Sequence, residues 1–199
     1  MKYCFQVLLP LSLLIIAAPA SSQIEISYDD GTAETGIVRE VGVRFTVDEP
    51  LQLVGGRFFV ITAQPTNSLG VIVLDANGVG SAPGDTLFGP DTLAWNGTDL
   101  SFTDYQFPNP VEIPGTDFYV VYFQTMDGPL GQTPVLGLDL DPPFHHRSWK
   151  LINNVWTQIQ EDINGKVMIR AVVLDPTPVE AVSWGLLKIR AMKRDLGSK

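Results

Sequence analysis

The first residues that could do chemistry form a short oxygen-rich stretch, Asp75-x-Asn77-Gly78-x-Gly80. It offers side-chain oxygen atoms at alternating positions and glycines for a sharp turn, as calcium-binding loops require. The late bidentate glutamate of an EF-hand is absent, and Asp85 is the candidate for a further ligand. The alternative is a glycine-rich connection between two strands that holds no ion. We therefore name Asp75, Asn77 and Asp85 as candidate calcium ligands and expect no other cofactor.

The second group combines aromatic rings with a basic side chain. Trp149 and Trp156 flank Asn153-Asn154, a pair typical of a tight hairpin turn, so the two rings can approach each other across the hairpin. Sugar-binding sandwiches stack pyranose rings on exposed aromatic planes beside polar side chains such as Arg147. The competing explanation is that these rings close one end of the core. Trp149, Trp156 and Arg147 are therefore candidate ligand-binding residues.

Candidates for a histidine-based site are few. His145 and His146 are the only histidines, and neighbouring residues of an extended chain point to opposite sides, so the two cannot face one metal without a bend. Asp139 and Asp141 lie just upstream and could complete a site, but Pro142-Pro143 marks a loop junction. Two surface histidines in a loop are the simpler interpretation.

The adjacent carboxylates of Asp29 and Asp30 could imitate the acid and base of a glycosidase. Glycosidases hold two carboxyl groups on opposite sides of a sugar, and nothing in the sequence selects such a pair from 22 acidic residues. Because Gly31 follows, a solvated Asx turn is more typical. The sequence also lacks a serine-nucleophile elbow, a His-Glu-x-x-His pair and a phosphate-binding glycine loop. We therefore expect no enzymatic activity.

Composition and charge limit the classes of protein to which the chain can belong. Its 199 residues suit one domain, and 45% hydrophobic against 18% charged residues exclude an intrinsically disordered chain. The formal net charge of −9 argues against binding to nucleic acid. Cys4 is the only cysteine and lies near the N-terminus, so no disulfide or thiolate metal site is expected after it.

The first 22 residues have the features of an export signal. Lys2 supplies a positive charge, residues 7–17 are largely apolar, and Ala18-Pro19-Ala20 provides the small residues of a cleavage site. The apolar stretch is shorter than the about 20 residues that span a bilayer. We predict that residues 1–22 are a cleaved signal peptide, that the protein is secreted or lies at the cell surface, and that no transmembrane span remains.

The elements that must position these residues are predicted to be strands. Val41, Val43, Phe45 and Val47 alternate with smaller or polar residues, which is typical of a half-buried strand. Further candidate strands lie at 24–28, 57–61, 71–74, 100–107, 118–123, 135–140, 147–152, 155–159 and 167–174. Turn residues separate them, and no segment between 23 and 175 keeps a helical period. The sequence therefore predicts an all-β, antiparallel two-sheet sandwich over residues 23–175, jelly-roll-like rather than a closed barrel.

Residues 176–199 differ from the sandwich in charge. Pro176-Thr177-Pro178 is a stiff spacer, residues 179–194 could form a short helix, and the last twelve residues carry five basic side chains against Asp195. One explanation is a frayed appendage or a helix packed on the sandwich, and the other is a sorting or anchoring tail. We expect the tail to be dispensable for folding but required for surface retention or assembly.

Three patches carry a resemblance to a known group. Residues 28–34 (YDDGTAE), the Asp- and Gly-rich residues 75–87, and residues 147–171 with Trp149, Trp156 and the sequence GKVMIRA resemble exported bacterial β-sandwich modules. Such modules are accessory parts of larger secreted or surface proteins, so the resemblance implies a non-catalytic extracellular module. We expect a structural or adhesive role with a surface protein or extracellular polysaccharide as partner. The alternative is a carbohydrate-binding module stabilised by calcium.

Overall fold

The computed structural model describes residues 22–62, 68–94, 100–124, 134–161 and 163–175, which belong to one compact unit, Ser22–Pro176. The predicted tail lies outside the described residues, and so does the predicted signal peptide apart from Ser22. No helix in the described ranges is long and apolar enough to cross a membrane.

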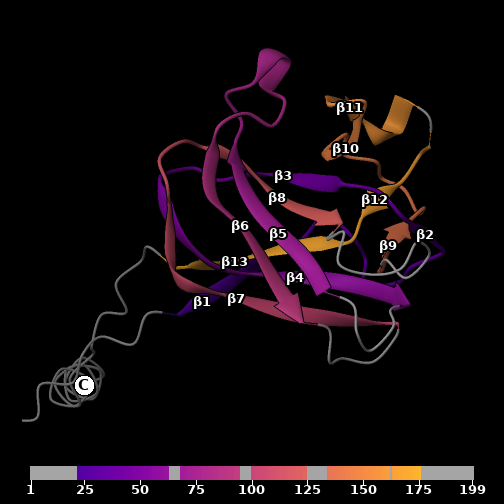
Figure 1. Ribbon diagram of the computed structural model, residues 1–199, viewed down its shortest axis with the longest axis horizontal. Helices are drawn as coiled ribbons and strands as arrows, with labels where there is room; N and C mark the ends of the chain where they lie inside the picture. Colours follow the sequence, from indigo (N-terminus) through magenta and orange to yellow (C-terminus); the bar gives the residue numbers. More distant parts are fainter. Residues whose placement is uncertain (1–21, 63–67, 95–99, 125–133, 162, 176–199) are drawn as a thin grey trace, which may run out of the picture. The chain divides into compact units, whose positions relative to one another are not determined.

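In the described residues, thirteen strands form two sheets, here called sheet A and sheet B, and every pairing between strands is antiparallel (Figure 1). Sheet A contains β1 (Gln23–Ile26), β2 (Thr35–Ile37), β4 (Leu51–Thr62), β7 (Ser101–Ile113), β9 (Val135–Asp139), β12 (Lys166–Val167) and β13 (Ile169–Leu174). Sheet B contains β3 (Val41–Thr46), β5 (Ser68–Asp75), β6 (Thr86–Ala94), β8 (Asp117–Gln124), β10 (Ser148–Ile152) and β11 (Val155–Gln158). Two single 3-10 turns complete the described elements, η1 (Val79–Ser81) and η2 (Ile159–Glu161). The predicted all-β two-sheet sandwich is confirmed.

The pairings between strands define their order in each sheet. In sheet B the order is β11-β10-β3-β8-β5-β6. In sheet A, β4 pairs with β7 along one side and with β13 and β9 in succession. The last strand changes partners at Met168, whose N–H donates to the carbonyl of Gly137 (3.0 Å) and whose carbonyl accepts from the N–H of Phe59 (3.0 Å). β12 therefore continues into β13 while passing from β9 to β4.

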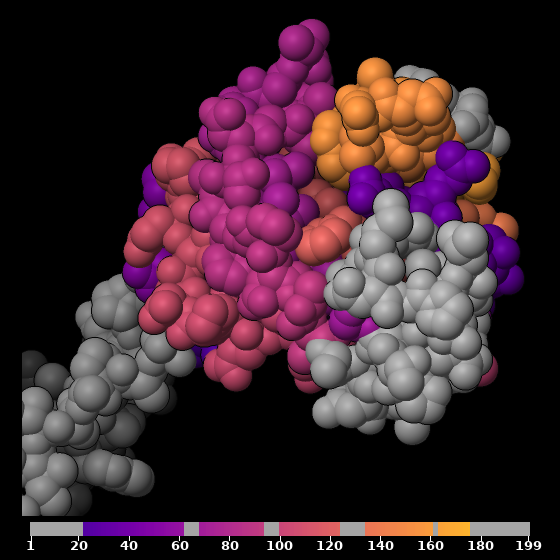
Figure 2. All heavy atoms as spheres, viewed as in Figure 1, coloured from indigo at the N-terminus to yellow at the C-terminus, as the bar shows by residue number. Residues whose placement is uncertain are grey.

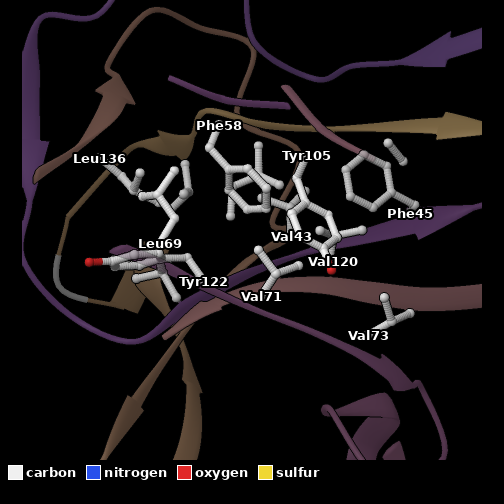
Figure 3. Close-up of a cluster of buried hydrophobic side chains, with 14 of the residues drawn as sticks. Val43, Phe45, Phe58, Leu69, Val71, Val73, Tyr105, Val120, Tyr122 and Leu136 are labelled. Atoms are coloured by element: carbon white, nitrogen blue, oxygen red, sulfur yellow. The ribbon is translucent and has the colours of Figure 1, made fainter. Parts of the chain in front are cut away.

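The inner faces of the two sheets form one core. Figure 3 shows Phe58 and Leu136 from sheet A close to Val71, Val120 and Tyr122 from sheet B, and all five are fully buried. The alternation in β3 that predicted a half-buried strand corresponds to this core, because its apolar side chains point inward. Burial of these branched and aromatic side chains is the main source of stability for a sandwich of this kind.

The predicted hairpin around Asn153-Asn154 is confirmed. β10 and β11 pair from Trp149 opposite Gln158 to Ile152 opposite Val155. Asn153 and Asn154 have φ angles of 50° and 62°, and two successive left-handed residues are what a tight type I′ hairpin turn requires.

The sequence did not predict β2, β6, the first half of β4 or the second half of β7. β6 contains Pro90 and β7 contains Pro108 and Pro110, residues that argue against a central strand. Both strands lie at an edge in the described part of the sheets, since β6 pairs only with β5 and β7 only with β4. A proline in an edge strand can face away from the neighbouring strand, where it costs no hydrogen bond of the sheet. The prolines of β6 and β7 are therefore compatible with strands, although they argued against strands in the sequence.

Replacing Phe58 by Ala should destabilise the sandwich by about 3–5 kcal/mol, because the phenyl ring is fully buried between the sheets. Urea unfolding followed by tryptophan fluorescence measures the change. Val155→Ala is the matched control, since Val155 is 58% exposed, and its effect should stay within about 0.5 kcal/mol. Equal effects of the two substitutions would contradict the placement of Phe58 in the core.

Candidate functional site

The candidate calcium ligands Asp75, Asn77 and Asp85 lie at the end of β5 and in the loop that joins it to β6. Asn77 Oδ1 accepts a hydrogen bond from the N–H of Asp85 (2.9 Å), and Asn77 Nδ2 donates to Asp85 Oδ2 (2.9 Å). Asp75 Oδ1 accepts from the N–H of Ala76 (2.7 Å). A Cβ atom on Gly84 would lie 1.9 Å from Asn77 Oδ1, so the loop requires glycine there. Hydrogen bonds within the loop thus use several of the candidate ligand atoms, and calcium binding stays a prediction.

The candidate aromatic residues lie on the outer face of sheet B. Trp149 is 7% exposed and packs edge-to-face on Tyr119, with 6.0 Å between ring centroids. Leu74 and Val121 complete this buried cluster, and the half-buried Trp156 packs against it. In Figure 2 the β10–β11 hairpin (orange) lies beside the end of the β5–β6 segment (magenta) on this face. The structure therefore brings the two tryptophans to one face, as the hairpin predicted, but seats Trp149 inside a second hydrophobic cluster.

The loop that follows β5 covers part of this outer cluster. The hydroxyl of Tyr119 donates to the carbonyl of Ser81 (2.5 Å), and burial raises the pKa of Tyr119 to about 12. Trp149 Nε1 and Arg44 Nε are buried without a hydrogen-bond partner among the residues that the structure describes. The hydrogen bond from Tyr119 therefore attaches this loop to the outer face of sheet B.

Arg147, the third candidate ligand-binding residue, contacts the N-terminal segment. Its guanidinium lies 4.4 Å from the ring centroid of Tyr28, and its Nη1 donates to Thr46 Oγ1 (2.7 Å). Tyr28 in turn stacks on the core residue Phe45 at 5.6 Å. A cation held over an aromatic ring and hydrogen-bonded to a strand is well suited to fixing this segment.

Asp139, one of the aspartates near the two histidines, forms a buried ion pair with a lysine. The Asp139 carboxylate is fully buried, and its Oδ2 lies 2.8 Å from Lys166 Nζ. The same oxygen accepts from the N–H of Asp30 (3.0 Å), and Oδ1 accepts from the N–H of Asp141 (2.8 Å). Carboxylate oxygens of Asp30, Asp139 and Asp141 lie within 4.8 Å of one another, but the ammonium group of Lys166 already compensates the buried charge. Among the described residues, neither His145 nor His146 belongs to this group of carboxylates.

A second charged network lies on the outer face of sheet A, and sequence reasoning missed it. Arg57 of β4 donates from Nη1 to Glu25 of β1 (2.5 Å) and from Nε to Asp104 of β7 (2.6 Å). Arg170 of β13 donates from Nη1 to the other oxygen of Glu25 (2.7 Å) and also pairs with Asp29. Both guanidinium groups lie over a phenyl ring of β7, at 5.2 and 4.0 Å from its centroid. The network joins four neighbouring strands.

Hydrogen bonds from two arginines lower the pKa of Glu25. Partial burial raises its pKa, but hydrogen bonds from Arg57 and Arg170 outweigh this effect and leave the pKa below the ordinary value of 4.5. The same hydrogen bond raises the pKa of Arg57, so the pair is ionised at neutral pH.

Beside this network the outer face of sheet A is hollowed. The hollow has a volume of about 390 Å3, and we call it the Gly55 hollow after the glycine on its floor. Its lining includes Glu25, Gly55, Arg57, Asp104, Gln106 and Val172, which come from β1, β4, β7 and β13. The one local signal for it in the sequence is the pair Gly55-Gly56 within an apolar strand, a pattern that indicates a bulge or a close approach.

No family model and no curated protein matches the chain. Among solved structures, a clostridial cysteine protease, Cwp84 after propeptide cleavage, matches with 15% identity and a TM-score of 0.48 over 75% of this chain. A structure of the cysteine protease and lectin-like domains of Cwp84, a surface-layer-associated protein of Clostridium difficile, matches with 16% identity and a TM-score of 0.40 over 68% of this chain. The chain spans 40% and 32% of the length of these two structures. Both TM-scores are below 0.5, so neither similarity indicates a function for this chain.

Replacing Lys166 by Met should destabilise the sandwich by about 3–5 kcal/mol, because it leaves the buried Asp139 carboxylate without its cation. Urea unfolding at pH 7 measures the loss. The double variant Asp139→Asn with Lys166→Met should recover part of it, since no uncompensated charge remains. As the control for an exposed pair, Asp104→Asn should cost less than about 1 kcal/mol, because Asp104 is 74% exposed. A loss in Lys166→Met no larger than in Asp104→Asn would contradict the buried pair.

The free energy of unfolding should fall as the pH is lowered through the depressed pKa of Glu25. The carboxylate is paired with two arginines only in the folded state, so its contribution is present above pH 4.5 and is lost below it. Glu25→Gln should therefore lose less stability than the parent chain between pH 5 and about pH 3. Urea unfolding across this range measures both slopes, and identical slopes would show that Glu25 is not paired.

Proposed function

We propose that this chain is a non-catalytic module of the cell exterior with a structural or adhesive role. One observation carries the proposal: the two ends of the sandwich meet. Gln23 of β1 lies opposite Leu174 of β13, so the two ends of residues 23–175 are neighbours once residues 1–22 have been removed. A domain whose ends leave side by side can be attached to a larger structure at one place, while its other surfaces stay accessible.

The loops at the other end of the sandwich suit a partner. In Figure 1 the loop with η1 and the β10–β11 hairpin lie away from the junction of β1 and β13. Binding residues are concentrated on loops that a rigid scaffold positions. The signal-like residues 1–22 and the resemblance to exported bacterial sandwich modules support a location outside the cell. The partner classes are a surface protein and an extracellular polysaccharide.

Carbohydrate binding is the second candidate function. The Gly55 hollow favours it, because it offers a concave site with apolar and hydrogen-bonding groups together on the face of a sheet.

Expression of the full chain in a Gram-negative bacterium tests the proposed location. The protein should appear in the periplasm or the medium without residues 1–22, because this segment has the charge, apolar stretch and small residues that export requires. Cell fractionation and N-terminal sequencing measure both properties. A variant without residues 2–22 is the control and should stay in the cytoplasm.

The non-catalytic role is tested by incubating the exported chain with polysaccharides. Release of reducing ends, or cytoplasmic retention with Met1 intact, would contradict the proposal.

A further inference from the structure

We propose that the Gly55 hollow binds a neutral sugar residue of an extracellular polysaccharide. This inference rests on the proposed function, since it names one ligand class and a binding site for it on the face of sheet A, separate from the loops with η1 and the β10–β11 hairpin. The aromatic pair of sheet B is not part of this site, because the hollow lies on the outer face of the other sheet.

The backbone of β4 builds the hollow. The pairing of β4 with β7 shifts register between Leu53 and Gly55, and the pairing of β13 with β4 shifts at Val172/Val173, so an irregularity lies at the same level on both sides of one strand. A Cβ atom on Gly55 would lie 2.7 Å from the carbonyl oxygen of Tyr105, so the strand approaches too closely for any larger residue. Bulges of this kind occur frequently beside binding sites. Glycine is therefore required where the strand is irregular, and the hollow lies over this irregularity.

The floor and the rim of the hollow differ in chemistry. We call the apolar lining of Val54 and Val172 the floor, because Val54 is buried, and the more exposed charged lining of Glu25, Arg57 and Asp104 the rim. A pyranose ring has the same division, since its C–H groups form a face and its hydroxyl groups lie around the edge. Carboxylates accept hydrogen bonds from hydroxyl groups and a guanidinium donates to them, so one ring can satisfy floor and rim together.

The ion pairs hold the rim in place before a ligand arrives. Arg57 is fixed between Glu25 and Asp104 at 2.5 and 2.6 Å, so binding a ligand does not have to order these side chains. Asp104 is 74% exposed, and its Oδ2 has no hydrogen-bond partner among the described residues. Gln106 lies opposite Gly55 across β4 and β7, is exposed, and can both donate and accept.

The balance of charges favours a neutral ligand. An anion would lie against the carboxylates of Glu25 and Asp104, and a cation would lie against Arg57. A hydroxylated ligand without charge can use both kinds of group without desolvating an unpaired charge. The volume of about 390 Å3 lies at the lower end of the range for small-molecule sites, which fits one or two sugar residues of a longer chain.

The test is titration of the full chain with four neutral hexasaccharides: cellohexaose, xylohexaose, mannohexaose and hexa-N-acetylchitohexaose. Amide signals in two-dimensional 15N–1H spectra report the site. At least one sugar should shift the amides of Gly55, Gly56 and Gln106 in a saturable way. Asp104→Asn should weaken binding by about tenfold or more, as expected for a lost hydrogen bond to a charged group. Val172→Phe should abolish binding, because the larger ring fills the hollow.

Two controls keep the result specific. Val155→Phe adds the same ring at an exposed position of sheet B and should leave binding unchanged, and Trp156→Ala should do the same. Asp104→Asn replaces an exposed side chain, so it remains a valid test if Val172→Phe fails to fold.

Three results would overturn the inference: no saturable shift with any of the four sugars, shifts that Val172→Phe and Asp104→Asn leave unchanged, or loss of binding in Trp156→Ala alone. Normal export together with no sugar binding would reject the sugar site and leave the proposed module intact. Cytoplasmic retention would reject the proposed function whatever the titration shows.

Discussion

The pair between Arg170 and Asp29 holds the N-terminal segment on the sandwich. The Asp29 side chain is 1% exposed and accepts hydrogen bonds from two nitrogens of Arg170, so its charge is compensated only when β13 is in place. Arg170 also binds Glu25. Tyr28, the residue before Asp29, stacks on Phe45 of the core. Arg147 then lies over Tyr28. One arginine in the last strand thus contacts both Glu25 of the first strand and the buried Asp29 of the segment that follows it.

Hydrogen bonds of polar side chains connect the two sheets. The hydroxyl of Tyr105 in β7 donates to Asp91 in β6 (2.5 Å), and this bond lowers the pKa of Asp91 while burial raises that of Tyr105. On another side, Ser148 Oγ of β10 accepts from the N–H of Val167 in β12 (2.9 Å). These bonds satisfy groups that packing alone would leave unpaired, so they fix how the two sheets lie on each other.

The fold could be predicted from the sequence because most strands carry their own pattern. Alternation in β3 and the Asn153-Asn154 turn are local signals, and both correspond to the structure. Edge strands interrupted by proline carry no such pattern, since a partner on one side is enough to hold them. The Gly55 hollow was beyond prediction for another reason: its residues come from four strands, and only the pairing of distant segments brings them together. The hairpin predicted that Trp149 and Trp156 share a face, but nothing local reveals that Tyr119 buries Trp149.

The pairing of β1 with β13 also determines when the chain can fold. Gln23 lies opposite Leu174, so sheet A is complete only after nearly the whole domain is available. Contacts between residues so far apart in sequence form slowly, because a long loop must be closed before the contact stabilises anything. A chain that crosses a membrane with its N-terminus first would therefore reach the far side before it could become compact. Slow closure of the last strand would leave such a chain extended while it crosses, so that it would fold on the far side of the membrane.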